Sequence, residues 1–392
     1  MDLVSIRGRY FWKGDERFLL KGVVYQLSGR DPLEDDSVNQ LRRSIPYLKQ
    51  LGLNTIFVYF IDNTKNHDIA MDLLAECGIH VLFCLSTPRS CINRQASLES
   101  YKKDLLQGYF STIDCVAAYP NTLGVIVANE VINSGASTHA ASVIRAVTRD
   151  VKKYMALAAD ICQQRVLPVG VNSSKIMNVF KSEFDYLTSG NESDALDFFC
   201  FNNYSWCGKS SMQTSGYDRL VTIFANAHVP VFFSEYGCNI PSPRLFLETH
   251  AIYSSEMTGV FSGGIVYEFF ELVNRYGLVK LAETGELETL QDFHNLKNSF
   301  EQCLDVRPNT LAVWSDSQFT STKAPTMPAK SSYWQASTEL PGCPVDWDEA
   351  RSELEDGQWV DVEREIREFE VDDLADSMWQ RFRISGTGPR WT

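Results

Sequence analysis

The sequence has no long hydrophobic segment: nowhere in its 392 residues do about 20 apolar residues follow one another, as a membrane-spanning helix requires. Residues 1–12 are polar and charged and lack the apolar stretch of a signal peptide. The last eight residues lack the hydrophobic tail of a GPI-anchor signal. We therefore expect no transmembrane segment, and either an intracellular chain or one whose targeting segments are not part of this sequence.

Sequence motifs for metal binding are missing too. The ten cysteines form no Cys-x-x-Cys pair, and the six histidines form neither His-x-His nor His-Glu-x-x-His. We expect no metal and no cofactor. Ten cysteines are also too sparse for a disulfide scaffold in a chain of this length. Cys84 and Cys200 lie inside apolar runs and are expected to be free thiols in the core.

Positive charge is scarce. The formal net charge is −14, and the residues from Val345 onward account for more than half of it, with 14 acidic and 6 basic side chains. An acidic surface repels phosphate backbones, and no basic run offsets this repulsion. The sequence therefore predicts no nucleic-acid partner.

Eight short apolar runs, rich in Val, Ile and Phe, recur through the first 270 residues. They cover residues 19–26, 55–60, 80–86, 123–130, 167–172, 198–204, 229–236 and 263–270. Such nearly continuous apolar runs are typical of strands covered on both faces. Helical patterns alternate with several of them, at 38–51, 68–77, 99–118, 140–163 and 217–227.

This alternation predicts a parallel sheet, and eight strand–helix units predict a closed (β/α)8 barrel of the TIM type. The rival fold, a doubly wound open sheet, would need a Gly-rich phosphate turn after the first run, and residues 26–30 do not form one. We expect the catalytic barrel to occupy residues 1–310. Residues 311–343 are rich in Ser, Thr and Pro, which is typical of a linker. Residues 344–392 are acidic and are expected to form a tail or to cap the barrel.

Acidic residues at strand ends are the strongest functional signal, because the active site of a β/α barrel lies at the C-terminal ends of its strands. Glu130 ends the fourth run, Glu235 ends the seventh, and Glu268 comes late in the eighth. An apolar strand behind a carboxyl desolvates it, which raises its pKa and suits a general acid. A single such glutamate is more often an arginine's partner at the rim. Two of them on facing strands predict a pair that converges on one sugar ring, as in retaining glycosidases.

Aromatic residues end most of the other strands. They are Tyr25 (followed by Gln26) in the first run, Tyr59 in the second, Tyr204 and Trp206 at the sixth, and Tyr267 in the eighth. Flat rings with polar tips suit sugars, which offer apolar faces and hydroxyl edges. Any one of these rings could be a core residue, but their common position favours a carbohydrate site.

The order and spacing of these motifs resemble the fungal β-1,3-glucanosyltransferases, glycoside hydrolase family 72, which remodel cell-wall glucan. The matching stretches run in order from near the N-terminus to about residue 279. They are KGVVYQ (21–26), DPL (31–33), IPYLK (45–49), NTI (54–56), VY (58–59), LSTP (85–88), INR (92–94), NEV (129–131), YSWCG (204–208), FSEYGCN (233–239) and FSGGIVYE (261–268).

The resemblance implies that Glu130 is the acid/base and Glu235 the nucleophile of a covalent cycle. This cycle would cleave an internal β-1,3 linkage and transfer the new end to another β-1,3-glucan, without a metal or cofactor. Asn129 would bond the sugar 2-hydroxyl, and Tyr204 and Tyr267 would orient the nucleophile and the sugar beside it. The implied substrate-binding residues are Gln26, Tyr59, Ser86, Asn93, Arg94, Asn129, Tyr204 and Tyr267, with Tyr59 and the 86–94 loop at donor subsites.

The chain departs from the family pattern at two places. After the fifth strand the family has an Asp-rich segment with an arginine that contacts substrate, whereas residues 171–180 here read VNSSKIMNVF. Leu41, Ala70 and Ser189 stand where the family has cysteines, so two of its three disulfides are expected to be absent. Cys207 and Cys238 match the third pair, and a bridge between them is expected.

By resemblance, the protein belongs at the cell surface or cell wall, where the family is GPI-anchored. Glycosylation sequons at Asn172 and Asn191 agree with this location. Two other functions stay open. One is an endo-β-1,3-glucanase, in which water reaches the intermediate before a sugar does. The other is a catalytically weak glucan-binding paralogue, which the altered 171–180 segment favours and the retained glutamates disfavour.

Overall fold

The computed structural model describes residues 2–87, 90–303 and 323–356. Its centre is a closed barrel of eight parallel strands in chain order, in which β11 pairs back to β4. The strands are β4 (Leu20–Val24), β5 (Thr55–Val58), β6 (His80–Cys84), β7 (Thr122–Asn129), β8 (Val169–Ser173), β9 (Phe198–Asn202), β10 (Val231–Tyr236) and β11 (Gly263–Val266). Each expected apolar run overlaps one of these strands, although β7 begins one residue before its run and β8 ends one residue after its run. The (β/α)8 prediction is confirmed, and the doubly wound sheet is excluded.

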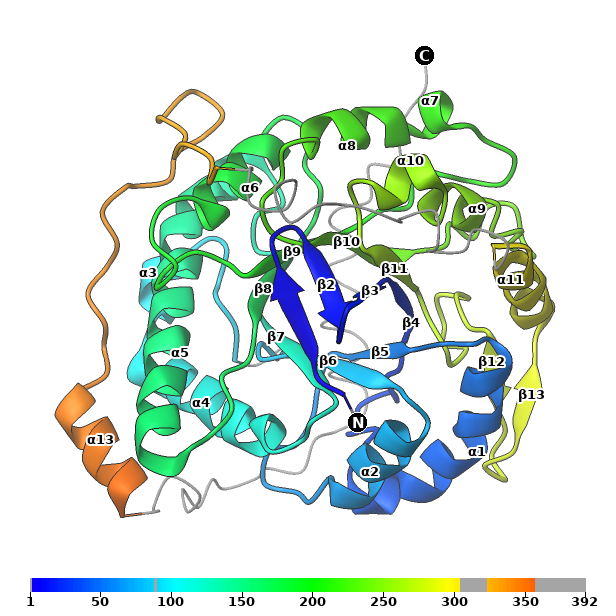
Figure 1. Cartoon of the computed structure of the whole chain (residues 1–392), viewed down its shortest axis with the longest axis horizontal. Helices are drawn as coiled ribbons and strands as arrows, with labels where there is room; N and C mark the ends of the chain where they lie inside the picture. Colours follow the sequence, from blue (N-terminus) through cyan, green and yellow to red (C-terminus); the bar gives the residue numbers. More distant parts are fainter. Residues whose placement is uncertain (1, 88–89, 304–322, 357–392) are drawn as a thin grey trace.

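Helices form a ring around the barrel (Figure 1). The longer ones are α1 (Val38–Gln50), α2 (Asp68–Glu76), α4 (Lys103–Ala117), α5 (Ala141–Cys162), α6 (Phe180–Thr188), α8 (Tyr217–Ile223) and α11 (Gln291–Gln302). Shorter elements are η1 (Asp35–Ser37), α3 (Ser97–Ser100), η2 (Gly135–Ala140), α7 (Met212–Ser215), α9 (Glu248–Ile252) and α10 (Ser255–Thr258), with the hairpin β12 (Val279–Leu281) and β13 (Leu287–Thr289). All five expected stretches contain a helix, although 99–118 is divided between α3 and α4 and the helix expected at 217–227 ends at Ile223.

An unexpected three-stranded sheet closes the N-terminal end of the barrel. It consists of β1 (Val4–Arg7), β2 (Tyr10–Lys13) and β3 (Glu16–Phe18), and it lies across the barrel axis in Figure 1. The ring of Phe11 lies 6.1 Å from that of Phe198 and 5.9 Å from that of Phe232, at the starts of β9 and β10. This plug leaves the opposite end of the barrel, where the strands finish, for the site.

The barrel interior is a packed apolar core. The side chains that fill it include Val24, Phe57, Leu82, Ile126, Cys200, Phe232 and Ile265, all buried. Such layers of bulky side chains are typical of TIM barrels. Polar groups at the strand ends therefore rest on an apolar floor.

Residues 323–356 pack along the barrel wall and end in α13 (Trp347–Glu355), which lies beside α4 and α5 in Figure 1. Trp334 is 1% exposed, and its ring lies 5.5 Å from that of Tyr186. The ring of Trp347 lies 6.2 Å from that of Phe110. The described part of the expected linker thus covers the barrel. Residues 311–322 and 357–392 lie outside the described residues, so the expected domain boundaries and acidic tail stay predictions.

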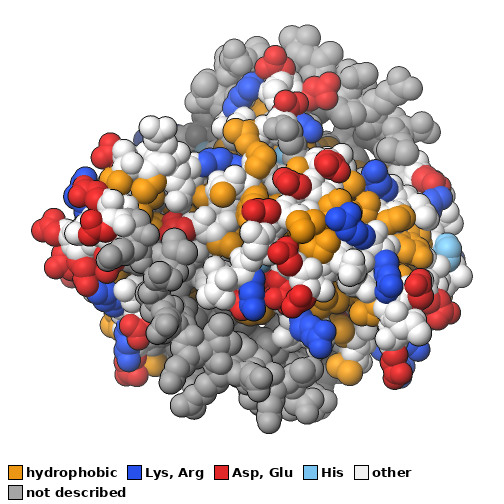
Figure 2. All heavy atoms as spheres, turned by 90° about the horizontal axis from the view of Figure 1, so that it is seen from below, with side chains coloured by type: hydrophobic (Ala, Val, Ile, Leu, Met, Phe, Trp, Pro, Cys, Tyr) orange, Lys and Arg blue, Asp and Glu red, His pale blue; other side chains and the backbone are white. Residues whose placement is uncertain are grey.

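The surface carries mixed charge. Acidic and basic side chains are interspersed on the face in Figure 2, with hydrophobic side chains between them. Within residues 2–87, 90–303 and 323–356, no helix has both the length and the apolar character needed to cross a membrane.

Candidate active site

The two candidate catalytic glutamates lie at the C-terminal end of the barrel, as expected. Glu235 belongs to β10 and is 2% exposed. Glu130 follows β7 directly, and its backbone N–H donates to the carbonyl of Asn172, 2.8 Å away. Its φ of +50° lies in the left-handed region, which is uncommon for a residue other than glycine. Such conformations gather at functional sites, where the surrounding structure holds them in place.

Both carboxylate oxygens of Glu235 accept hydrogen bonds from phenols. Tyr204 donates to Oε2 at 2.7 Å, and Tyr59 donates to Oε1. The contact of Tyr204 was expected. Tyr59 was expected at a donor subsite, so its bond to Glu235 is an addition that strand-end position alone did not reveal. Two donors aimed at one carboxyl favour its charged form.

A chain of amides joins the two carboxyls. Nδ2 of Asn202, the last residue of β9, donates to Oε1 of Glu130 at 2.9 Å, and its side chain also bonds to Glu235. The Ser234 hydroxyl lies 3.0 Å from Oδ1 of Asn202 and 2.5 Å from Oδ1 of Asn172. Nδ2 of Asn172 in turn donates to Oδ1 of Asn129 at 2.7 Å. This chain fixes the orientation of Asn129 and places Asn202 against both glutamates.

Burial dominates the titration of this pair. It raises the pKa of Glu130, against the opposing effects of the Asn202 hydrogen bond and the charge of Arg94. Burial and then the charge of Glu130 raise the pKa of Glu235 to about 7, while the bonds from Tyr59, Tyr204 and Asn202 lower it. Because the two carboxylates repel each other, ionisation of one raises the pKa of the other. The two ionisations are therefore coupled, and the carboxyl that ionises second has the higher pKa.

A third buried carboxyl lies next to this pair. Burial raises the pKa of Glu268 to about 8. Nδ2 of Asn274 donates to its Oε1 at 2.9 Å and to the Tyr267 hydroxyl at 3.3 Å. The ring of Tyr267 stands edge-on to that of Tyr204, with 6.4 Å between centroids. Tyr267 thus lies at the catalytic end of the barrel, as expected.

The expected substrate-binding residues of the 86–94 loop do not hydrogen-bond to the carboxyl groups of the two glutamates in the part of the chain that the structure describes. Nη2 of Arg94 donates to the backbone carbonyl of Glu130 at 2.9 Å, so this arginine does lie at the pair. The side-chain oxygen of Asn93 instead accepts the backbone N–H of Gln95, 2.9 Å away, which forms a local turn. Ser86 lies 3.0 Å from the Cys84 sulfur. No bond of Asn93 or Ser86 to either glutamate exists within the described residues.

The side chain of Gln26 connects two loops, the one after β4 and the one after β5. Its Oε1 accepts the backbone N–H groups of Tyr59 and Phe60, at 3.1 and 3.0 Å, and its Nε2 donates to the carbonyl of Arg30 at 2.9 Å. It was expected to bind substrate directly. In the structure its side chain positions the backbone of Tyr59, which carries the phenol that bonds to Glu235.

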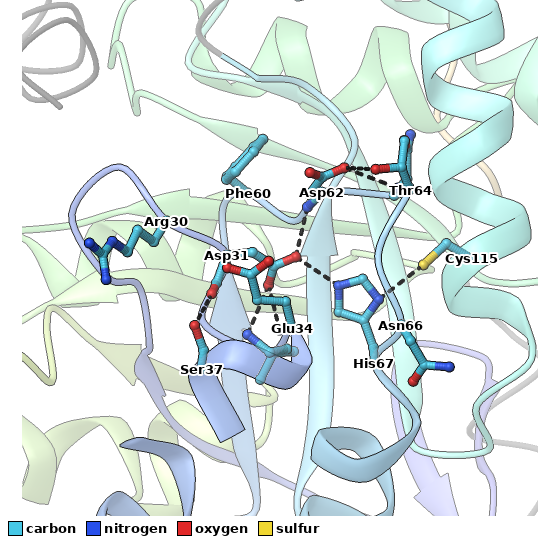
Figure 3. A network of polar contacts seen from close by, with 12 residues as sticks. Arg30, Asp31, Glu34, Ser37, Phe60, Asp62, Thr64, Asn66, His67 and Cys115 are labelled. Carbon is cyan, nitrogen blue, oxygen red and sulfur yellow. Dashed lines mark hydrogen bonds and ion pairs between the residues drawn. The ribbon is translucent and has the colours of Figure 1, made fainter. Parts of the chain in front are cut away.

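The same two loops share a second, buried connection (Figure 3). Oδ2 of Asp31, in the loop after β4, lies 2.7 Å from Nε2 of His67 and accepts the backbone N–H of Asp62 at 2.7 Å. Nδ1 of His67 lies 3.4 Å from the Cys115 sulfur on α4. Burial lowers the pKa of His67, but its bonds to Asp31 and Cys115 raise it more, to about 10. The pair is therefore an ion pair at neutral pH.

The expected disulfide is present: Cys207 and Cys238 are bonded, with their Cα atoms 5.2 Å apart. Cys84 and Cys200 are free and buried, as expected. The sequon at Asn172 is not available to a glycosyltransferase in the folded protein, because its side chain is buried and bonds through both amide atoms. Asn191 is exposed, and its glycosylation stays a prediction.

Sequence reasoning missed Asn202, Asn172 and Asn274. Asn202 ends the sixth strand and Asn172 is the last residue but one of the fifth, so the position that identified the glutamates would have identified these amides too. Asn274 lies in an irregular loop beyond β11, and no periodicity points to it.

Comparisons with known proteins agree with this geometry. A model of glycoside hydrolase family 72, described as glucanosyltransferase, matches residues 1–304. The chain is 43% identical over 301 residues to the 1,3-beta-glucanosyltransferase gel1 of Aspergillus fumigatus, which covers 76% of this chain and 65% of that protein. It is 40% identical over 350 residues to the 1,3-beta-glucanosyltransferase GAS5 of Saccharomyces cerevisiae, covering 87% and 70%. The chain thus spans less than two thirds of the length of gel1.

A solved structure is similar throughout the barrel. It is a mutant of Saccharomyces cerevisiae Gas2p in complex with laminaritetraose and laminaripentaose. The TM-score is 0.78 at 35% identity, and the match covers 88% of this chain and 75% of that one.

Proposed function

Because the chain belongs to the glucanosyltransferases of glycoside hydrolase family 72, we propose that it is a retaining 1,3-β-glucanosyltransferase. The observation that carries this proposal is the carboxyl pair, Glu130 and Glu235, which interacts with one amide, Asn202, above an apolar floor. Contact with a single amide favours the short separation of a retaining pair, about 5–5.5 Å, over the longer one of an inverting pair.

The first step is glycosylation of Glu235. Its carboxylate attacks the anomeric carbon of the donor, while Glu130 donates its proton to the glycosidic oxygen that leaves. The division of roles follows from the hydrogen bonds. Glu235 has the phenols of Tyr59 and Tyr204 to stabilise its negative charge, whereas Glu130 has Asn202 and the more distant Arg94. The phenols therefore favour the charged form of Glu235, and in the proposed cycle Glu130 carries the proton.

The second step is transfer. Glu130, now a carboxylate, removes the proton of an acceptor hydroxyl, the oxygen attacks the anomeric carbon, and the bond to Glu235 breaks. When the acceptor is a sugar, a longer glucan results. Asn129 supports both steps, because its Oδ1 is held by Asn172 and its Nδ2 remains for the 2-hydroxyl of the reacting sugar.

The substrate we propose, as donor and as acceptor, is β-1,3-glucan. The similar Gas2p structure is a complex with laminaritetraose and laminaripentaose, which are short β-1,3-glucans. A polysaccharide substrate and relatives named as glucanosyltransferases favour a place of action at the cell surface or cell wall. Attachment there through a GPI anchor is part of the proposal.

The mechanism is tested by trapping its intermediate. A laminaribiosyl fluoride with fluorine at the sugar 2-position slows both steps and lets the glycosyl–enzyme accumulate. Peptide mapping by mass spectrometry should then find the added disaccharide on Glu235 alone. An adduct on Glu130 would reverse the two roles. Turnover of unmodified glucan without any trapped adduct, together with inverted product configuration, would exclude the covalent mechanism.

A further inference from the structure

Four hydrogen-bonding groups converge on the buried carboxylate of Asp31, in the loop that follows β4 (Figure 3). Its Oδ1 accepts the backbone N–H groups of Leu33 and Glu34, at 2.8 and 3.2 Å. Its Oδ2 accepts the backbone N–H of Asp62 at 2.7 Å and lies 2.7 Å from Nε2 of His67. An ionised carboxyl has about four sites for donors, so these groups occupy the carboxylate fully.

Two of these bonds hold the loop after β5. Asp62 lies near the start of that loop, and His67 is its last residue before α2. Gln26, in the same loop as Asp31, accepts the backbone N–H of Tyr59 at 3.1 Å. Tyr59 and Asp62 are only three residues apart in the sequence. The backbone between them is therefore fastened at each end to the loop after β4.

The position of this backbone decides where the phenol of Tyr59 points. Tyr59 follows β5 directly, is 8% exposed, and donates to Oε1 of Glu235. Its hydroxyl lies at the far end of a long, rigid side chain, so a small rotation of the backbone displaces the hydroxyl by more than the backbone itself moves. A hydrogen bond weakens steeply as its geometry departs from the optimum. Release of the loop from Asp31 would therefore weaken the bond to Glu235 without changing either of its partners.

We propose that Asp31 is a positioning residue for the glycosyl-transfer reaction: with His67, it holds the loop after β5 where Tyr59 donates to the nucleophile Glu235. This role goes beyond the contribution of the ion pair to stability, because it predicts an effect on the chemical steps in a protein that remains folded. The inference rests on the proposed function for the reaction whose rate is measured.

The first test is a double-mutant cycle on kcat for transfer from laminaripentaose. Asp31→Asn replaces one carboxylate oxygen by an amide nitrogen that only donates, so two of the four contacts are lost. It should lower kcat about ten-fold, because a small misplacement of a catalytic group is costly. In the Tyr59→Phe background, which has no hydroxyl to position, Asp31→Asn should lower kcat by less than about two-fold.

The pH profile supplies a readout that a loss of stability alone would not move. Burial raises the pKa of Glu235, and the bond from Tyr59 lowers it. Asp31→Asn weakens that bond, so the pKa of Glu235 should rise. The acid limb of the kcat/KM profile should therefore move to higher pH, in the same direction as in Tyr59→Phe.

Changes in nearby charge do not account for such a shift. Burial lowers the pKa of His67 and its bond to Asp31 raises it, so removal of that carboxylate favours the neutral imidazole and the pair stays without net charge. The other ionisable groups that face Glu235 are the same in the wild type and in Asp31→Asn. They are Glu130, Glu268, Tyr204 and Tyr267.

Asp150→Asn is the matched control. Asp150 on α5 is 1% exposed and accepts from Tyr101 and Arg149, so the variant loses a buried carboxylate of the same kind away from the two loops. It should lower stability and leave both kcat and the acid limb unchanged. If Asp31→Asn does not fold, His67→Gln takes its place in the cycle and in the pH profile, with the same outcomes expected.

The expected result is a loss of kcat that disappears when the Tyr59 hydroxyl is absent. Losses that multiply in the double variant, or an acid limb that does not move in Asp31→Asn, would overturn the inference and leave the proposed function intact. Absence of glucan transfer by the wild-type protein would overturn the proposed function, and the inference with it.

Discussion

The phenol of Tyr204 donates a hydrogen bond of 2.7 Å to Oε2 of Glu235. Glu235 is buried and Tyr204 is partly buried, and a donor to a charged acceptor in such a place is worth roughly 1.5–3 kcal/mol. In the proposed cycle the charge on Glu235 disappears as the glycosyl bond forms and returns as it breaks. The bond therefore differs in strength between ground and transition states, and its removal affects the chemical steps.

Tyr204→Phe should lower kcat by on the order of ten- to a hundred-fold, with a smaller effect on KM. The matched control is Tyr217→Phe on α8. The hydroxyl of Tyr217 is buried and has no partner in the described part of the chain, so its removal should leave kcat unchanged.

The pH profile supplies a second readout for Tyr204→Phe. A phenol that donates to a carboxylate stabilises its charged form and lowers its pKa, so the variant has a higher pKa at Glu235 than the wild type. The acid limb of the kcat/KM profile should therefore move to higher pH. An unchanged kcat with an unmoved acid limb would assign Tyr204 to packing and leave Tyr59 as the main donor.

Glu130→Gln and Glu235→Gln should each abolish turnover and leave the fold intact, because each carboxyl has a separate role in the covalent cycle. Circular dichroism and thermal melting report the fold, and release of reducing ends from laminarin reports turnover. Glu183→Gln is the matched control. Glu183 on α6 is also buried, and burial raises its pKa to about 8, but it bonds to Ser173 and lies outside the proposed machinery. Loss of turnover in this control would show that any buried glutamate is required.

The ion pair of His67 and Asp31 makes a prediction about stability. The pKa of His67 is raised to about 10, above the value of about 6.5 in an unfolded chain. Because protonated His67 is favoured in the folded protein, it contributes its full stabilisation below about pH 6.5, and this contribution is lost as the pH rises to about 10. In urea unfolding, the free energy of unfolding of the wild type should therefore exceed that of His67→Gln by about 3 kcal/mol or more at about pH 6. This difference should shrink as the pH rises toward about 10. A gap that is constant with pH would mean that His67 is neutral in the fold.

The disulfide between Cys207 and Cys238 closes a loop with a sequence separation of 31, so its reduction should lower the free energy of unfolding by about 3–4 kcal/mol. In peptide mapping of the folded protein without reductant, both cysteines should resist alkylation. The exposed thiol of Cys162 should react readily and serves as the internal control. Alkylation of Cys207 and Cys238 at the rate of Cys162 would contradict the bridge.

The barrel could be predicted from sequence because each strand is a compact apolar run, and burial on both faces leaves little room for polar residues. The plug of β1, β2 and β3 escaped prediction because its strands are only three or four residues long. Its signals were present in the two-residue connections Gly8-Arg9 and Gly14-Asp15, since both glycines have positive φ and such turns join hairpin strands.

The catalytic pair could be predicted because a carboxyl at the end of an apolar strand is rare and costly, and position alone reveals it. The side chains that surround the pair could not be predicted in the same way. Tyr59 follows β5, whereas Asn202 ends β9 and Tyr204 follows that same strand, and which of them reaches Glu235 depends on the closure of the barrel.

The measurement that tests the central claim most directly is mass spectrometry of the products formed from borohydride-reduced laminaripentaose together with its unreduced form. A glucanosyltransferase joins a fragment of one chain to another, so products longer than five glucose units should appear early and carry β-1,3 linkages. Shorter products alone, with water as the acceptor, would contradict transfer and identify an endo-β-1,3-glucanase. No change in either oligosaccharide, with binding retained, would identify a glucan-binding protein.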